Sequence, residues 1–226
     1  MKNQEQPVRL SSSSLSLYLE CPKCFWLYKA KGIHRPKQTF ALQSNFDAIL
    51  KQYFDKFRRE NKMPPELNGQ VEGRLFENQE LLNKWRNALR PVLTYKHPEH
   101  NFALVGGIDD CLFDKGYYIP IDFKTTGSNN FHFNAEKYYQ HQLDIYNFLL
   151  EQNGYKTKNT GYLVYYKPKE VIARGVIEFQ IAVKKMETSN ERAKSLFEEG
   201  VKILLGPAPK SHSECEYCSW GSDSAD

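Results

Sequence analysis

The chain has 226 residues, of which 40% are hydrophobic and 14% aromatic, so it is long and apolar enough to bury a substantial core. Its 31 basic and 27 acidic residues give a net charge of only +4, which permits nucleic-acid binding without requiring it. The polar start Met1–Leu10 lacks the apolar region of a signal peptide, and no segment reaches the roughly 20 apolar residues of a membrane span.

We therefore expect a soluble, cytoplasmic protein without a membrane partner. Residues 1–13 are predicted to form a flexible leader, residues 14–220 a single domain, and residues 221–226 a tail. The serine run Ser11–Ser14 offers N-caps for a short helix, which Pro22 interrupts. Because proline is tolerated in the first turn of a helix, a second helix can begin there at once, and we expect a bent helical pair.

Basic and aromatic side chains alternate along the second of these helices and just beyond it. The basic residues are Lys23, Lys29, Lys31, His34, Arg35 and Lys37, and the aromatic ones are Phe25, Trp26 and Tyr28. Such a set could follow a phosphate backbone while its rings stack on unpaired bases, and it could equally be a solvated helix face.

A longer helix is predicted between Ser44 and Arg59, because apolar residues recur there at steps of three and four. Its other face is basic, and we expect that face to be solvated, with Lys51, Lys56, Arg58 and Arg59 on it. Prolines and an Asn-Gly pair then mark a loop, and a further helix is predicted from about Glu77 to Arg90, before Pro91.

The second half of the chain alternates strands and helices. We expect a hairpin of Phe102–Phe113 and Tyr117–Phe123, a helix over Glu136–Gln152, strands Gly161–Lys167 and Arg174–Val183 separated by a turn at Pro168, and a helix over Ser189–Leu205. This order predicts an α/β fold in which a mixed β-sheet is flanked by helices.

The triplet Asp122-Phe123-Lys124 lies near the end of the second hairpin strand. Alone it is a weak signal, because a D/E-x-K triplet occurs by chance on the order of once per chain of this length. Glu60-Asn61-Lys62 is such a chance match, since it ends a helix and enters a proline loop. Residues two apart on a strand share a face, so Asp122 and Lys124 are expected to point the same way.

Asp109 is the expected partner of Asp122. A two-residue loop at Lys115-Gly116 would place the two aspartates directly opposite each other, with Cβ atoms within about 5.5 Å. A four-residue loop would keep this pairing, whereas a three-residue loop would put them on opposite faces. Two carboxylates on one face are costly without a cation between them, so this pairing predicts a Mg²⁺ or Mn²⁺ site in which Lys124 orients or deprotonates a water molecule.

Three motifs in series give a specific resemblance. The residues Gly106-Gly107-Ile108-Asp109, then Asp122-Phe123-Lys124, then Gln142-Leu143-Asp144-Ile145-Tyr146 match the order and spacing of GxxD, (D/E)xK and QxxxY. In these motifs the chain resembles the RecB-like branch of the PD-(D/E)XK nucleases, over about residues 15–220.

The resemblance implies a restriction-endonuclease-like core and a Mg²⁺- or Mn²⁺-dependent deoxyribonuclease that hydrolyses phosphodiester bonds. It implies catalytic roles for Asp109, Asp122, Lys124, Gln142 and Tyr146, with the metal held by the two aspartates. RecB-like enzymes often carry a metal-binding histidine on the first core helix. Asp47 stands at the corresponding place here, so it is the expected third metal ligand.

The implied substrate is DNA, single-stranded or with free ends, processed in repair, recombination or CRISPR adaptation, where protein partners are expected. Two other functions remain open: a catalytically inactive nucleic-acid-binding module of the same fold, and a metal-clipped scaffold for protein partners. The set of Asp109, Asp122 and Lys124 favours the nuclease, because a module that only binds needs no such set on one face.

Four of the five cysteines form two CxxC pairs, Cys21 with Cys24 and Cys215 with Cys218. Two such pairs are typical of a four-thiolate metal site that joins the N- and C-terminal segments, and either zinc or an iron–sulfur cluster satisfies it. His212 is a spare ligand for zinc. The resemblance favours a 4Fe-4S cluster, which AddB-type and CRISPR-associated adaptation exonucleases hold with terminal cysteines. That subset usually has one early and three late cysteines, so zinc stays open.

Overall fold

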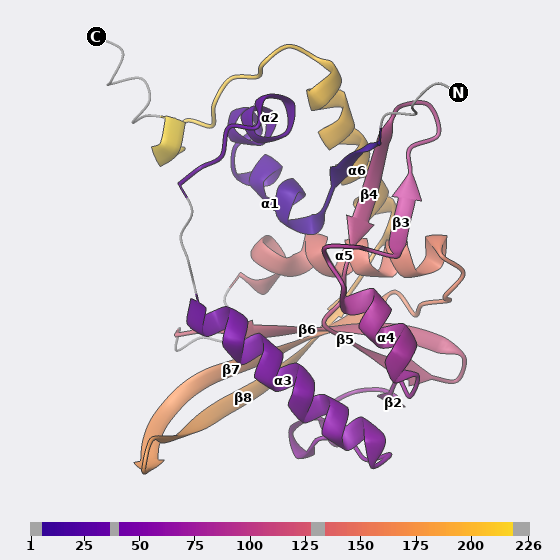
Figure 1. Ribbon diagram of the computed structural model, residues 1–226, viewed down its shortest axis with the longest axis vertical. Helices are drawn as coiled ribbons and strands as arrows, with labels where there is room; N and C mark the ends of the chain where they lie inside the picture. The colour runs from indigo at the N-terminus through magenta and orange to yellow at the C-terminus, as the bar shows by residue number, and fades with distance from the viewer. Residues whose placement is uncertain (1–5, 37–40, 128–133, 219–226) are drawn as a thin grey trace.

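The computed structural model describes residues 6–36, 41–127 and 134–218; the expected tail over residues 221–226 and Lys37 lie outside them. The described chain forms two sheets with helices around them (Figure 1). The larger sheet has five strands in the order β2-β5-β6-β7-β8, and the smaller has three in the order β1-β4-β3. The strands of the larger sheet are β2 (Arg74–Leu75), β5 (Asp110–Asp114), β6 (Tyr117–Thr125), β7 (Thr160–Ala173) and β8 (Val176–Glu187).

The larger sheet is mixed, as expected. Strands β6 and β7 run parallel, and the other neighbours are antiparallel. Helix α5 (Ala135–Gln152) is the crossover between β6 and β7 and packs on one face of the sheet, while α3 (Ala41–Arg59) crosses the other face (Figure 1). Because strand side chains alternate, β6 places Ile121 and Phe123 in the cluster under α3 and turns Asp122 and Lys124 toward α5.

Helix α5 is central to the main core. It contacts β3 (Leu93–Lys96) and β4 (Phe102–Gly106) of the smaller sheet as well as β6 and β7 of the larger one. Two further helices, α1 (Ser12–Glu20) and α6 (Asn190–Leu205), also pack against it. Every side chain from Leu143 to Leu150 is buried as a result.

The expected register of the β5–β6 hairpin is confirmed. Asp114 pairs with Tyr117 and Asp110 with Ile121, so the connection is the two-residue turn Lys115-Gly116. Both turn residues have positive φ, 49° and 93°, which is the conformation of a tight turn matched to the twist of the strands.

The expected single strand Phe102–Phe113 is wrong, because the chain divides there between the two sheets. Strand β4 ends at Gly106 in the smaller sheet and β5 begins at Asp110 in the larger one. A Cβ atom added at Gly107 would lie 3.0 Å from the Trp85 carbonyl oxygen, so the segment between the two strands passes close to α4 and a larger residue would require the α4 backbone to shift. The helix expected over Glu77–Arg90 is likewise shorter, with α4 spanning Gln79–Arg86.

The turn expected at Pro168 is also wrong. Strand β7 continues through Pro168 to Ala173, and the reversal lies at Arg174-Gly175, where both residues have positive φ. The ladder between β7 and β8 is irregular between Pro168 and Glu170, and such an irregularity accommodates a residue that has no N–H to donate.

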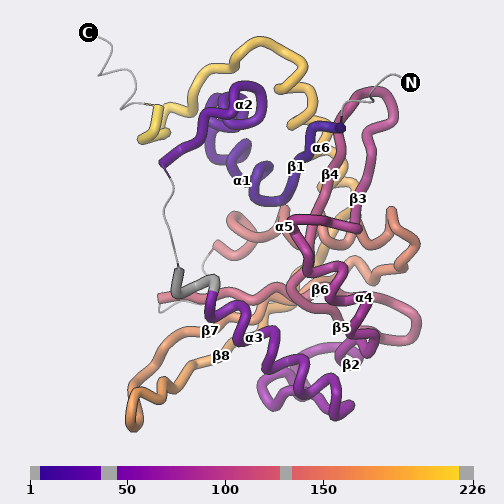
Figure 2. Tube along the Cα trace, in the orientation of Figure 1, coloured from indigo at the N-terminus to yellow at the C-terminus, as the bar shows by residue number. Residues whose placement is uncertain are grey.

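The flexible leader expected over residues 1–13 is wrong from Val8 onward. Val8–Leu10 form β1, which pairs in parallel with β4, and the Leu10 side chain is fully buried. Ser11 then caps α1, and α2 (Pro22–Lys31) follows directly, so the expected bent helical pair is confirmed. Helix α2 lies beside the segment that follows α6, so the N-terminal helical pair and the C-terminal segment are in contact (Figure 2).

Within the described residues, none of the helices combines the length and the apolarity that crossing a membrane requires.

The burial of Leu10 predicts a stability effect that a flexible leader would not show. Leu10→Ala should lower the free energy of unfolding by about 2 to 5 kcal/mol, because it leaves a cavity in the main core. Urea unfolding followed by circular dichroism measures the change. Val8→Ala, on the same strand but 39% exposed, is the matched control and should change stability far less. Equal, small effects of both substitutions would contradict the assignment of β1.

Candidate functional site

The structure gathers five of the residues singled out in the sequence at one end of β6. Asp122 and Lys124 come from β6, Asp109 from the residue before β5, and Gln142 and Tyr146 from α5. Asp122 is only 1% exposed and Tyr146 is buried. The β5–β6 register ends with Asp110 paired to Ile121, so the next residues on each side, Asp109 and Asp122, come together just beyond the ladder. The α5 residues meet them because their four-residue spacing puts both on one helix face.

Gln142 connects the carboxylate to the lysine. Its Nε2 donates to Asp122 Oδ1 at 2.7 Å, while its Oε1 accepts from Lys124 Nζ at 2.9 Å. Tyr146 also donates its hydroxyl to Asp122 Oδ1, at 3.3 Å. The amide is thereby oriented with its nitrogen toward the acid and its oxygen toward the ammonium group.

Further contacts hold Asp122, Lys124 and Asp109 in place. Lys124 Nζ forms an ion pair with Asp122 Oδ2, and the backbone N–H of Phe123 donates to Asp109 Oδ2 at 3.2 Å. The ammonium group also lies 4.7 Å from the centre of the Tyr139 ring, a cation–π contact that the sequence analysis missed. Tyr139 precedes Gln142 by three residues, so the same helix-face argument would have found it.

Burial has the largest single influence on the pKa of both Asp122 and Lys124. It raises the pKa of Asp122 to about 7, against the lowering effect of Lys124 and with the help of the nearby Asp109. Burial alone would lower the pKa of Lys124, but the attraction of Asp122 outweighs it, so the pKa of Lys124 is raised. Lys124 is therefore an ammonium group at neutral pH, beside a carboxyl that still exchanges a proton there.

The residues present fit a hard divalent cation. Two carboxyl groups stand close enough that the charge of Asp109 raises the pKa of Asp122. Asp122 Oδ2 is fully buried and, apart from its ion pair with Lys124, has no hydrogen-bond partner among the described residues. Oxygen ligands from paired carboxylates are those that Mg²⁺ and Mn²⁺ accept, and a cation there would relieve the repulsion between them.

Asp47, the expected third ligand, reaches this group only through Lys51. Lys51 Nζ lies 2.7 Å from Asp47 Oδ2 and 2.9 Å from Asp109 Oδ1. The prediction that Lys51 belongs to a solvated helix face is therefore wrong, since its side chain is only 22% exposed and bridges two acids. Asp47 also lines a pocket of about 490 Å³ together with Lys124 and Tyr139.

A buried ionic network lies behind the site. Arg86 bridges Asp55 and Asp110 at 2.8 Å each, and Arg58 forms ion pairs with the same two acids. Arg58 is buried, so the prediction that it is solvated is wrong. Arg86 Nε also donates to the carbonyl oxygen of Asp109 at 2.7 Å, which fixes the backbone from which the Asp109 carboxylate projects.

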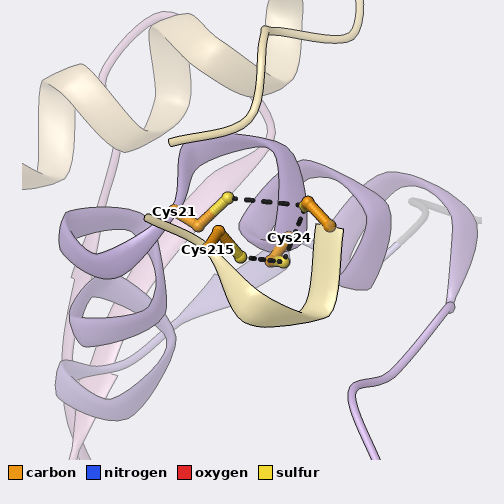
Figure 3. Close-up of side chains that lie close together, drawn as sticks. Cys21, Cys24 and Cys215 are labelled. Carbon is orange, nitrogen blue, oxygen red and sulfur yellow. Dashed lines mark hydrogen bonds between the residues drawn. The ribbon is translucent and has the colours of Figure 1, made fainter. Parts of the chain in front are cut away.

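The four paired cysteines come together where α2 begins and the C-terminal segment passes (Figure 3). Their Sγ atoms all lie within 4.8 Å of one another, and the expected gathering of these thiols is confirmed. Arg35 donates to Cys215 Sγ at 3.6 Å, which places a positive charge beside the thiols.

Cys111 is buried on β5 and is not part of the group. His212 is not part of it either, and its Nδ1 accepts from the Glu214 N–H.

Several of the basic residues near α2 have partners within the chain. Lys29 Nζ donates to the Arg9 carbonyl oxygen at 2.7 Å, and Lys31 Nζ lies 5.5 Å from the centre of the Trp26 ring. Arg35 forms an ion pair with Glu20 at 2.6 Å.

Known proteins resemble the chain in family and in fold. The family model described as the PD-(D/E)XK nuclease superfamily matches residues 9–222. A solved structure described as "Crystal structure of SSO0001" is similar with a TM-score of 0.51 and 18% identity, over 98% of this chain and 87% of that chain. None of the curated proteins is significantly similar to the chain. The expected α/β fold, a restriction-endonuclease-like core with a mixed sheet flanked by helices, is confirmed.

The raised pKa of Asp122 predicts a pH-dependent stability. Because the pKa is 3.8 in an ordinary aspartate and about 7 in the folded protein, the folded state keeps a proton that the unfolded state loses between these values. Stability therefore falls as pH rises through this window. Measured by urea unfolding in a chelator, the wild type should lose about 2 kcal/mol or more relative to Asp122→Asn between about pH 4 and pH 8. Parallel pH profiles of the two proteins would contradict the burial argument.

Proposed function

The chain belongs to the PD-(D/E)XK nuclease superfamily, and from that premise we propose that it is a Mg²⁺- or Mn²⁺-dependent deoxyribonuclease that hydrolyses phosphodiester bonds. The observation that carries the proposal is that Asp109, Asp122 and Lys124 lie together at one site. Asp122 and Lys124 form an ion pair, and Gln142 forms hydrogen bonds to both of them. A module that only binds nucleic acid needs no buried acid paired with a lysine, so the inactive alternative explains these contacts less well.

Each residue has a distinct proposed role. Asp109 and Asp122 would hold the cation, which when bound would neutralise charge on the phosphate and polarise the attacking water. Lys124 acts as an ammonium group, because its pKa is raised, so it donates a hydrogen bond to a phosphate oxygen or to the water and does not remove a proton. Gln142 and Tyr146 act as positioning residues that orient Asp122 and Lys124.

The finer assignment is to the RecB-like branch. It is supported by the QxxxY pair, since Gln142 and Tyr146 both contact Asp122 from one face of α5. We propose DNA that is single-stranded or has free ends as the substrate, in repair, recombination or CRISPR-adaptation processing with protein partners. Trp26 and Tyr28, which stay partly exposed on α2, support a single-stranded substrate, because every unpaired base offers a face for stacking. Phe25 is fully buried, so its expected stacking on a base is wrong. An iron–sulfur cluster and a single zinc ion are the two candidate occupants of the four-cysteine site.

Removing the Lys124 ammonium group tests the mechanism. With labelled single- and double-stranded DNA and either Mg²⁺ or Mn²⁺, the wild type should cleave DNA, and Lys124→Ala should be slower by roughly 100-fold or more. Lys62→Ala is the matched control, because Lys62 belongs to the other D/E-x-K triplet, is exposed and lies on a loop. It should cleave at the wild-type rate.

Two results would contradict the proposal. One is the absence of cleavage by the wild type with either metal ion. The other is equal cleavage by the wild type and Lys124→Ala, which would place the activity elsewhere or in a contaminant. Circular dichroism of each variant shows whether a loss of activity reflects the site or the fold.

A further inference from the structure

The spacing of the four sulfur atoms distinguishes between the two candidate metal groups. Cys24 Sγ lies 3.5 Å from Cys218 Sγ and 3.6 Å from Cys215 Sγ, and Cys21 Sγ lies 3.8 Å from Cys218 Sγ. Figure 3 shows Cys21 and Cys24, at the start of α2, close to Cys215 of the C-terminal segment. The four thiols are thus compact enough to surround a single atom.

This spacing is that of one tetrahedral ion. With Zn–S bonds of about 2.3 Å and tetrahedral angles, any two sulfur ligands of zinc lie about 3.8 Å apart. In a 4Fe-4S cluster each cysteine binds a different iron atom at the corner of a cube, so its four ligand sulfurs are spread much farther apart. Three of the separations here are 3.5 to 3.8 Å, and all four sulfur atoms lie within 4.8 Å of one another. The group is therefore closer to the geometry of one zinc ion than to the wider spacing of the iron–sulfur cluster that the resemblance favours.

We infer that Cys21, Cys24, Cys215 and Cys218 hold one structural zinc ion. The cysteine arrangement agrees, because two CxxC pairs are typical of zinc sites. Four protein ligands complete the coordination of zinc and leave no position for a substrate, so the ion is structural. Four thiolates around Zn²⁺ carry a net charge of −2, which the Arg35 guanidinium beside Cys215 partly offsets. The ion would connect residues 191 to 197 positions apart in the chain.

Metal analysis of the full chain tests this inference independently of nuclease activity. Purified under nitrogen, the protein should contain one zinc ion per chain, little iron and no visible colour. A brown protein with iron in a severalfold excess over zinc would overturn the inference, and so would a protein with neither metal. Replacing the zinc by Co²⁺ should give the intense visible absorption of a tetrahedral thiolate site, and its absence would also count against zinc.

Two matched variants distinguish the four-cysteine site from the fifth cysteine, Cys111. Cys24→Ser should lower the zinc content and the thermal stability, because it removes one of the four ligands. Cys111→Ala also removes a buried thiol but should keep one zinc ion per chain, since Cys111 is outside the group. Unchanged zinc in Cys24→Ser would overturn the assignment of the ligands.

A second observation concerns Lys51 and stands apart from the cysteines. Its ammonium group bridges Asp109, a proposed ligand of the Mg²⁺ or Mn²⁺ site, and Asp47, the third ligand expected from the sequence. Among the described residues, the four cysteines are the one group of three or more candidate ligands close enough to share an ion. Asp47 is not so placed while Lys51 lies between it and Asp109.

We propose that Lys51 competes with the divalent cation for Asp109 and Asp47 and thereby sets the metal affinity of the site. This rests on the proposed function, since it assumes that the cation binds these carboxylates. Lys51 is a positioning residue in this role, because it acts through the two acids. A positive charge at hydrogen-bond distance from a carboxylate changes its affinity for a proton by one or more pKa units, and a metal ion meets the same competition.

Mn²⁺ titration followed by calorimetry tests the role of Lys51 without relying on catalysis. Lys51→Met should bind Mn²⁺ roughly tenfold more tightly than the wild type, or tighter still. Lys56→Met removes the same charge from an exposed position of α3 and should leave the affinity unchanged. Asp122→Asn should weaken binding and so shows that the heat comes from this site.

The outcomes distinguish the two proposals. If the wild type and Lys51→Met bind Mn²⁺ equally well, or the variant binds it more weakly, the competition by Lys51 is wrong while the nuclease proposal stands. If neither protein binds Mn²⁺, the competition and the metal-dependent mechanism both fail. If only Lys51→Met binds, the competition is supported.

Discussion

The two-residue turn at Lys115-Gly116 is the constraint on which the site depends. It sets the register in which Asp110 pairs with Ile121, and that register brings Asp109 opposite Asp122. A slip of one residue would turn one of the two aspartates to the α3 face of the sheet, where Ile121 and Leu112 are buried. Side chains alternate between the two faces of the sheet along each strand. The register therefore determines both which apolar side chains are buried and which way the acids point.

Two sets of polar contacts then hold the acids on either side of that sheet. On the α5 face, Gln142 and Tyr146 satisfy the buried Asp122. On the α3 face, Arg58 and Arg86 neutralise the buried Asp110, and Arg86 also binds the carbonyl oxygen of Asp109. Buried charges are tolerated only when they are paired, so these partners reduce the cost of the acids and also restrict their positions. Stability and the geometry of the site thus rest on the same side chains.

The N-terminal and C-terminal segments are joined by contacts separate from those of the acids. Strand β1 adds to the smaller sheet, and the four cysteines connect the start of α2 to the segment after α6. Closing so long a loop restricts the unfolded chain, so a metal ion there would stabilise the whole domain. Since α1 and α6 both pack on α5, the joined ends also support the helix that carries Gln142 and Tyr146.

The sequence by itself determined the local features of this protein. Apolar periodicity located α3, the helices expected over Glu136–Gln152 and Ser189–Leu205 are α5 and α6, and residue spacing placed Gln142 and Tyr146 on one face. The turn residues indicated the hairpin, and the structure selected the two-residue loop. Tertiary structure alone decided which charges are buried, because Lys51, Arg58 and Arg86 meet acids from distant parts of the chain. It also divided Phe102–Phe113 between two sheets and made a strand of Val8–Leu10, since pairing with β4 is a long-range contact that no local pattern encodes.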